Sequence, residues 1–276
     1  MNYTKLTIKI NSTDKPPYFM GSQLRGAFGY ALKRVVCINP KYDCIDCFAQ
    51  NSCLFYNFYE EKNSFHKYRF DFTLAQSSYL FDYYLFDSAT KELPYILSAF
   101  IKMLKDNGLG KDKKTYSDFN IFINDELCTK NGDIKIPKDF RKILEIGDIK
   151  KDIELHFFTP LRIKKDNRFI RSDELELKDI INSIYQRQLQ LLGKPYRKFP
   201  YQIQGDIVDK NISYKELTRA SNRQKTTMNI GGLVGSMKIK NLNKECYEVL
   251  KVGELIALGK QTVFGLGKIK LKEINE

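Results

Sequence analysis

The sequence predicts an α+β protein built from two consecutive β-α-β-β-α-β units. Three observations lead to this prediction. Short segments alternate apolar and polar residues, as strands that are half buried do. Longer segments place apolar residues on one helical face. The same order of elements occurs twice, on either side of a connection at residues 126–152 that is rich in Lys, Asp and Gly.

The first unit opens with a strand at residues 4–10, in which Leu6 and Ile8 face the core. A helix follows at 22–36, with Ser22 as a plausible N-cap and Phe28 on its buried side. Gly108 is expected to end a second helix. The other elements expected in this unit are strands at 70–75, 79–86 and 116–123 and the second helix at 93–107.

The second unit repeats that order. A strand at 153–158 is expected to stop near Pro160, and a helix at 173–192 has Asp173 and Glu176 as a capping pair. The remaining expected elements are two strands flanking a turn at Gly231-Gly232, a helix at 247–258 and a last strand at 263–271. The predicted fold is therefore two tandem ferredoxin-like domains, at 1–125 and 153–276, joined by the connection at 126–152.

The charge balance favours a polyanionic partner. The 276 residues contain 46 Lys and Arg against 33 Asp and Glu, a net charge of +13. Nucleic acid is the commonest partner of such an excess. A membrane surface is disfavoured because the cations are not gathered in one tail or one amphipathic helix. With no apolar run of membrane-spanning length and no signal-peptide core, a cytoplasmic location is expected.

Four cysteines form a cluster after the first helix, in an insertion at about residues 37–60. Cys37, Cys44, Cys47 and Cys53 have the spacing C-x6-C-x2-C-x5-C. Clustered cysteines in a reducing compartment favour a metal over disulfides, and four thiolates suit a tetrahedral structural zinc. An iron–sulfur cluster is the alternative, because it also takes four thiolates.

Two segments of the second unit combine cations with aromatic residues. Residues 161–171 hold five cations against a single acid, directly after a strand. Residues 196–225 interleave Tyr and Phe with Lys and Arg. Bases stack on aromatic rings while cations bind phosphates, so both segments are candidate RNA contacts. The candidate residues are Arg162, Lys164, Lys165, Arg168, Arg219, Arg223 and Lys225.

A glycine-rich loop lies between the last helix and the last strand. Its sequence, from Gly259 to Lys268, is GKQTVFGLGK. Glycines let backbone N–H groups approach a phosphate closely, so Lys260, Gly265, Gly267 and Lys268 are candidate RNA contacts. A nucleotide-binding loop would need the glycines before a helix rather than after one, which excludes the P-loop and dinucleotide motifs. In the alternative interpretation the glycines serve only the turn into the last strand.

Taken together, these segments resemble the CRISPR-associated RAMP endoribonucleases that process precursor CRISPR RNA, of the type with a cysteine-rich insertion. The resemblance is carried, in order, by GSQLRGAFGYALKR at 21–34, the four cysteines, FTPLRIK at 158–164, SNRQ at 221–224, GGLVG at 231–235 and the glycine-rich loop. It implies CRISPR repeat RNA as the ligand, with other CRISPR effector proteins as further candidate partners.

The resemblance also implies a cut that needs no catalytic metal. The 2′-hydroxyl attacks the neighbouring phosphate and leaves a 2′,3′-cyclic phosphate and a 5′-hydroxyl. Such a reaction needs a base, an acid and a cation. A histidine expected on the first helix is replaced by Tyr30, so the catalytic candidates are Tyr30, Lys33, His66 and His156, with Arg25 as a further RNA contact.

Two other functions stay open at this point. One is a non-catalytic RAMP subunit that holds guide RNA in an effector complex. The other is a metal-stabilised RNA-binding regulator unconnected with CRISPR. Cleavage of repeat RNA in EDTA separates the enzyme from both.

Overall fold

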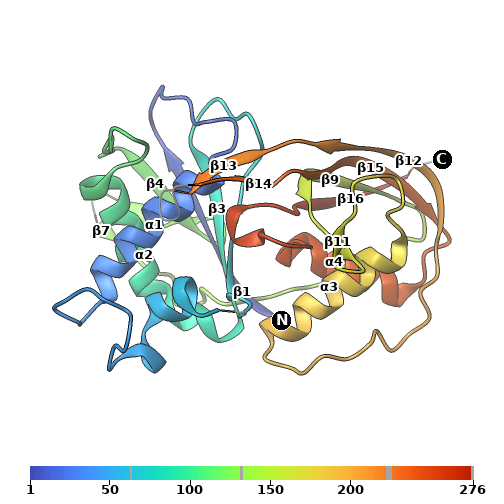
Figure 1. Ribbon diagram of the computed structural model, residues 1–276, viewed down its shortest axis with the longest axis horizontal. Coiled ribbons are helices and arrows are strands. Elements are labelled where there is room, and N and C mark those ends of the chain that lie inside the picture. The colour runs from blue at the N-terminus through green and yellow to red at the C-terminus, as the bar shows by residue number, and fades with distance from the viewer. Residues whose placement is uncertain (63, 131–132, 222–225, 275–276) are drawn as a thin grey trace. The chain divides into compact units, whose positions relative to one another are not determined.

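The computed structural model describes residues 1–62, 64–130, 133–221 and 226–274 (Figure 1). The chain divides into two compact units, Met1–Ile143 and Leu144–Glu276. The division falls inside the connection predicted at 126–152. No helix in the described residues is long and apolar enough to cross a membrane.

The first unit is built on an antiparallel sheet with the order β2-β3-β1-β4-β5. Strand β1 (Asn2–Ile10) is central and pairs with β3 (Leu80–Phe86) and β4 (Phe119–Ile123). Strand β2 (Tyr68–Asp71) lies outside β3. The short strands are β5 (Glu126–Leu127), β6 (Thr129–Lys130), β7 (Asp133–Ile134) and β8 (Lys142–Ile143).

Two helices, α1 (Gly21–Val36) and α2 (Leu93–Lys102), pack on this sheet. Phe28 of α1 lies 4.4 Å from Phe100 of α2 and 5.0 Å from Tyr83 of β3, measured between ring centroids. Leu6 and Ile8 of β1 are fully buried, as their alternation predicts. Helix α2 continues into a π-helical turn, η4 (Met103–Asn107), and Gly108 ends it with φ +72°. The order β-α-β-β-α-β is thus confirmed.

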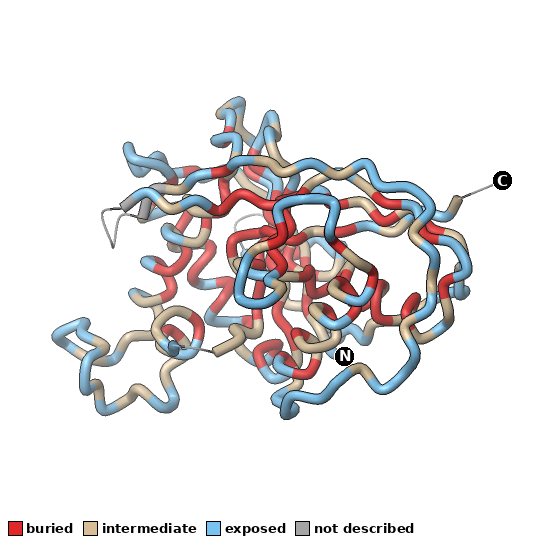
Figure 2. The backbone as a smooth tube through the Cα atoms, turned by 45° about the vertical axis from the view of Figure 1, so that its right-hand side comes forward, coloured by how far each residue is buried: buried red, intermediate tan, exposed pale blue. Residues whose placement is uncertain are grey.

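The second unit has a four-stranded antiparallel sheet with the order β12-β15-β9-β16. Strand β9 (Ile153–Leu161) lies between β15 (Gly232–Lys240) and β16 (Ile269–Glu273), and β12 (Asp206–Lys215) is at one edge. Helices α3 (Leu177–Leu191) and α4 (Lys244–Ile256) contribute the apolar side chains that bury this sheet's inner face. Figure 2 shows both cores as buried residues within their units. The tandem ferredoxin-like fold is confirmed.

Two hairpins extend the second unit. Strands β10 (Lys164–Lys165) and β11 (Arg168–Phe169) pair directly after β9. Strands β13 (Thr218–Ser221) and β14 (Thr226–Asn229) pair with each other between β12 and β15. The turn predicted at Gly231-Gly232 is therefore wrong, because the chain reverses between β13 and β14 instead. The two glycines allow close backbone approach: a Cβ on Gly232 would lie 2.4 Å from the Leu161 carbonyl oxygen.

Two helix starts differ from the prediction. Helix α1 begins at Gly21, so Ser22 lies inside it, and the N-cap Met20 makes no side-chain capping bond. Helix α3 begins at Leu177 rather than near Asp173. Glu176 is its N-cap, and Asp179 completes a capping box by accepting a bond from the Glu176 N–H at 3.1 Å. Glu176 and Asp179 therefore bond the free backbone N–H groups at the start of the helix. The predicted pair, Asp173 and Glu176, would have done so one turn earlier.

Strand boundaries also differ. Strand β9 continues through Pro160, because Pro160 lies beyond the residues that pair with β16 and beside a break in register with β15. Strand β2 ends at Asp71 rather than residue 75. Strand β16 begins at Ile269, since Gly265 and Gly267 have φ values of +82° and +73° that a strand does not accommodate.

Candidate functional site

In the first unit, Arg25 lies between two tyrosines. The hydroxyl of Tyr59, on the π-helical turn η2 (Tyr56–Glu60), donates to the Arg25 carbonyl oxygen at 2.9 Å. The Arg25 guanidinium lies 4.5 Å from the Tyr59 ring centroid, and its Nε donates to the Tyr68 hydroxyl at 3.2 Å. Gly29 makes room for this packing, because a Cβ there would lie 2.4 Å from Tyr59 Cε1. Arg25 thus holds η2 and β2 against α1.

His66 lies against the same cluster. Its ring stacks on Tyr68 with 6.0 Å between ring centroids and 26° between ring planes. Its Nδ1 is 2.9 Å from the Asn57 carbonyl oxygen. A carbonyl only accepts hydrogen bonds, so in the neutral ring Nδ1 carries the proton and Nε2 carries the lone pair. In this tautomer Nε2 is the nitrogen that can accept a proton.

The two tyrosines of this cluster are poor bases. Burial raises the pKa of Tyr59 well above its ordinary value and also raises the pKa of Tyr68. Both phenols therefore stay protonated near neutral pH. Within this cluster, proton transfer near neutrality falls to His66.

Tyr30 and Lys33 lie on α1. Tyr30 is 53% exposed, and its hydroxyl accepts a bond from Arg34 Nη1 at 2.5 Å. The Lys33 ammonium lies 5.1 Å from the Phe55 ring centroid, and its charge acts to lower the pKa of the Cys44 thiol against the larger effect of burial. Lys33 is therefore held at the base of the cysteine-rich insertion.

His156 belongs to the second unit, on the open face of β9. Its Nε2 lies 3.0 Å from Glu154 Oε2, and the Ser236 hydroxyl donates to the same carboxylate at 2.8 Å. The Ser236 bond and the neighbouring His156 hold the pKa of Glu154 below its ordinary value. His156 therefore lies beside the carboxylate of Glu154.

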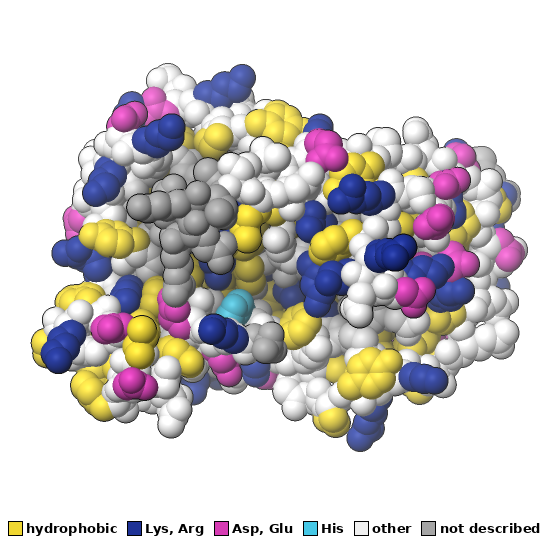
Figure 3. All heavy atoms as spheres, viewed as in Figure 1, with side chains coloured by type: hydrophobic (Ala, Val, Ile, Leu, Met, Phe, Trp, Pro, Cys, Tyr) yellow, Lys and Arg dark blue, Asp and Glu magenta, His cyan; other side chains and the backbone are white. Residues whose placement is uncertain are grey.

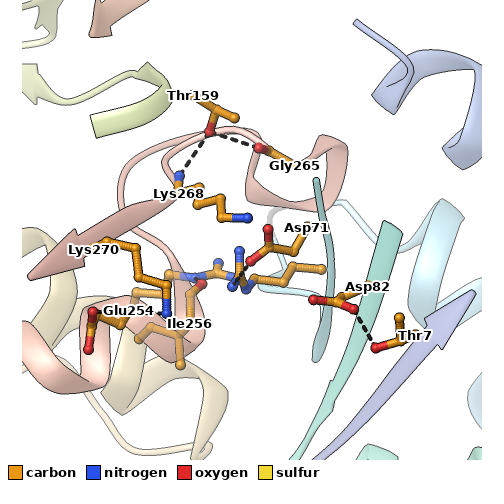
Figure 4. A network of polar contacts seen from close by, with 11 residues as sticks. Thr7, Asp71, Asp82, Thr159, Glu254, Ile256, Gly265, Lys268 and Lys270 are labelled. Atoms are coloured by element: carbon orange, nitrogen blue, oxygen red, sulfur yellow. Dashed lines mark hydrogen bonds and ion pairs between the residues drawn. The ribbon is translucent and has the colours of Figure 1, made fainter. Parts of the chain in front are cut away.

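The glycine-rich loop is anchored by a threonine that sequence reasoning missed. Thr159 is fully buried, and its hydroxyl donates to the Gly265 carbonyl oxygen and accepts the Lys268 N–H, both at 2.9 Å (Figure 4). Gly267 is held by its own bond to the Pro160 carbonyl oxygen at 3.2 Å. Strand β9 thus sets the loop's shape. Threonine is common in strands, so nothing in the sequence marks Thr159. Its hydrogen bonds to Gly265 and Lys268 in the folded protein reveal this role.

Glycine is required in the loop for local reasons. Gly259 and Gly267 have φ values of +79° and +73°, and a Cβ on either would lie within 2.5 Å of a carbonyl oxygen. Gly265 and Gly267 are buried. These observations explain why the turn needs glycine, whatever the loop binds.

Of the predicted cations that the structure describes, Arg162 is the most deeply buried. It is 8% exposed, lies 4.1 Å from the Phe169 ring centroid, and donates from Nη1 to the Gly231 carbonyl oxygen at 2.5 Å. Burial lowers its pKa. Arg162 therefore joins the β10–β11 hairpin to the start of β15.

The other predicted cations are distributed over the second unit. Lys164 and Arg168 are exposed on the β10–β11 hairpin, while Lys165 pairs with Glu176 at 3.1 Å. Arg219 lies 4.4 Å from the ring centroid of Phe264, inside the glycine-rich loop. Lys260 is exposed, and its N–H bonds the Arg162 carbonyl oxygen at 2.8 Å. Arg223 and Lys225 lie outside the described residues.

The four clustered cysteines are partly exposed and carry free thiols. Cys37 Sγ points to the Asn39 carbonyl oxygen at 3.8 Å, while Cys44 lies near Lys33 and Cys53. Burial raises the pKa of Cys44. In the described part of the chain, no three Cys, His, Asp or Glu side chains are arranged to hold one ion. The cysteines as placed do not form a tetrahedral site, so zinc stays a prediction from the sequence.

That prediction has a direct test. We expect one zinc ion per chain by elemental analysis, and Cys44→Ser should lower both the metal content and the melting temperature. Cys128→Ser is the matched control, because Cys128 is a buried free thiol away from the cluster in sequence. Protein without stoichiometric zinc or iron would contradict the metal site.

Comparison with known proteins supports the fold and identifies the second unit. Residues 155–269 match the family of the CRISPR-associated endoribonuclease Cas6, and residues 1–126 match a family described as an N-terminal domain. An uncharacterized protein of Archaeoglobus fulgidus is 24% identical over 93% of this chain and 92% of its own length.

Solved structures of Cas6 proteins have the same fold. A Thermus thermophilus Cas6 product complex superposes with a TM-score of 0.59 and 14% identity, over 99% of each chain. A second Cas6 product complex has a TM-score of 0.56 and 15% identity, over 99% of this chain and all of that one. The tandem fold and the match of residues 155–269 support the resemblance drawn from the sequence: the second unit matches the Cas6 endoribonuclease family, and the chain has the fold of the solved Cas6 proteins.

Proposed function

We propose that this protein binds CRISPR repeat RNA and cuts precursor CRISPR RNA without a catalytic metal. The observation that carries the proposal is the match of residues 155–269 to the Cas6 endoribonuclease family. The net charge of +13 and the exposed cations of the second unit fit an RNA ligand. We place the reaction in the cytoplasm, with CRISPR effector proteins as further candidate partners.

The reaction that we propose is an internal attack on phosphate. The 2′-oxygen forms a bond to the adjacent phosphorus, and the bond from phosphorus to the 5′-oxygen breaks. The 2′-hydroxyl proton passes to His66 Nε2, and the leaving 5′-oxygen takes a proton from an acid. The products carry a 2′,3′-cyclic phosphate and a 5′-hydroxyl. Support for His66 comes from its bond to Asn57, which places the lone pair on Nε2.

The remaining roles are assigned by chemistry. A cation is needed to stabilise the charged phosphorane, and Lys33 carries a fixed positive charge on the helix that also holds Tyr30. Tyr30 and His156 stay candidates for the acid. For the glycine-rich loop we propose backbone contact with RNA, with Lys260 and Lys268 as phosphate ligands and Thr159 as the residue that holds the loop in shape.

One experiment decides between the enzyme and a non-catalytic RAMP subunit. Repeat-containing RNA is incubated with the protein in excess EDTA, and the ends of any product are identified. We expect one defined cut that leaves a cyclic phosphate. Tight binding without a cut would establish the subunit instead, and a cut abolished by EDTA would contradict metal-independent cleavage.

A further inference from the structure

A second basic and aromatic surface lies on the segment that joins α3 to β12, residues 193–205. This α3–β12 segment contains three cations, three aromatic rings and two prolines, and it has no acidic residue. Tyr196 is 73% exposed and Tyr201 is 58% exposed. Figure 2 shows the segment as largely exposed, and Figure 3 shows hydrophobic and basic side chains side by side along the lower edge of the second unit, where the segment runs. Neither the glycine-rich loop nor the proposed reaction uses it.

The α3–β12 segment is ordered by contacts within its own unit. Gln186 Nε2 donates to the Arg197 carbonyl oxygen at 2.5 Å, and the Lys194 N–H bonds the Leu189 carbonyl oxygen at 2.8 Å. Asn243 Nδ2 donates to the Gln202 carbonyl oxygen at 2.8 Å. Pro195 and Pro200 restrict the backbone further. A ligand therefore meets a segment whose shape is already set, which reduces the entropy lost on binding.

Its aromatic rings are arranged edge to face. Phe199 is 5.3 Å from Tyr185 of α3 and 5.6 Å from Tyr201, with ring planes 72° and 65° apart. These edge-to-face contacts hold Phe199 in place. They do not cover the face of the Tyr201 ring with a stacked aromatic ring. The exposed Tyr196 and Tyr201 thus offer ring faces on which bases stack.

Its cations have no acidic partner among the described residues. Lys194, Arg197 and Lys198 are exposed and form no ion pair there, whereas Lys165 and Lys178 both contact Glu176. Unpaired cations beside open tyrosine rings suit a chain that has phosphates and unstacked bases. An acidic protein would pair with the cations, but its binding would give no role to the two exposed tyrosine rings.

We infer that the α3–β12 segment binds single-stranded RNA, as a contact separate from the glycine-rich loop. The inference rests on the proposed function, since it assigns this surface to the unstructured part of a precursor longer than the repeat. Arg197 and Lys198 would contact phosphates, and Tyr196 and Tyr201 would stack bases.

The test compares two RNAs and two double variants. One RNA is the repeat alone, and the other is the same repeat with a tail of unpaired uridines. With the tailed RNA, Tyr196→Ala with Tyr201→Ala should weaken affinity by about fivefold or more for each ring. Arg197→Ala with Lys198→Ala should flatten the slope of log affinity against log salt by about 1.4, which is 0.7 for each phosphate contact. With the repeat alone, both effects should be much smaller.

The control is Lys91→Ala with Tyr95→Ala on the first unit, where Tyr95 is 52% exposed and Lys91 contacts Glu92 at 3.7 Å. It should bind both RNAs as the unmodified protein does. Tail-dependent affinity that survives both segment variants would overturn the inference. Cleavage is scored separately on the unmodified protein, so a protein that binds the tail through this segment but never cuts would disprove the proposed function alone.

Discussion

Replacing His66 with alanine is expected to slow RNA cleavage by about 10²- to 10⁴-fold, the usual contribution of a positioned general base. The physical reason is its tautomer: the Nδ1–H bond to Asn57 leaves the lone pair on Nε2, and Tyr59 and Tyr68 nearby stay protonated. Single-turnover cleavage of repeat RNA measures the chemical step. Affinity, measured with RNA that has a 2′-deoxy group at the cut, should change little, since the loss lies in proton transfer.

The comparison variant is His156→Ala, which removes the other histidine of the chain and a candidate for the acid. Because His156 lies beside the carboxylate of Glu154, we expect a smaller loss of rate than for His66. Full activity in the His66 variant together with lost activity in the His156 variant would reverse the assignment. A melting temperature for each variant shows whether the fold survives.

Gly267→Ala is expected to destabilise the second unit by about 2–5 kcal/mol, combining a left-handed backbone with severe overpacking. The φ of Gly267 is +73°, and a Cβ would lie 1.9 Å from the Leu258 carbonyl oxygen. Relieving that contact would break the bond from the Gly267 N–H to Pro160, and with it the register of the glycine-rich loop on β9. Denaturant unfolding measures the loss.

Gly147→Ala is the control, because a Cβ at Gly147 meets no atom within 4 Å. It should change stability by less than about 0.5 kcal/mol. Lys268→Ala then separates the loop's RNA contact from its shape: the fold should persist while RNA affinity falls. If Lys268→Ala binds RNA normally and Gly267→Ala unfolds the protein, the loop serves the turn alone.

Much of the fold follows from local patterns. Leu6 and Ile8 alternate with polar residues along β1, and the sheet buries both of them fully. Phe28 recurs at helical spacing with Leu24 and packs between α2 and β3. Gly108 and Gly193 end their helices with positive φ, as glycine after an apolar run indicates. The spacing of apolar residues and the glycines that end helices are local features of the chain. A single sequence is therefore enough to predict them.

Two errors show what local patterns leave undecided. Gly231 and Gly232 form no turn and instead lie where β14 leads into β15. Glycine is needed there because the backbone carbonyls of Leu161 and Lys215 come close to these two residues. The N-cap is Glu176 rather than Asp173. The Glu176 side chain accepts the Asp179 N–H, and the Asp179 side chain accepts the Glu176 N–H. The glycine pair depends on which groups lie opposite it, and spacing along the chain does not contain that information. The cap is a local pair, and two overlapping pairs of acids, 173 with 176 and 176 with 179, were both present in the sequence.

The sequence by itself determined the order β-α-β-β-α-β in both units, the basic charge, and the candidate list of cations, histidines and cysteines. Only the tertiary structure decided which groups each candidate side chain contacts and how deeply it is buried. It placed Arg25 between Tyr59 and Tyr68, buried Arg162 against Phe169, and gave the glycine-rich loop its anchor in Thr159. Element order depends on local periodicity, whereas hydrogen-bond partners and burial depend on residues far apart in the chain that folding brings into contact.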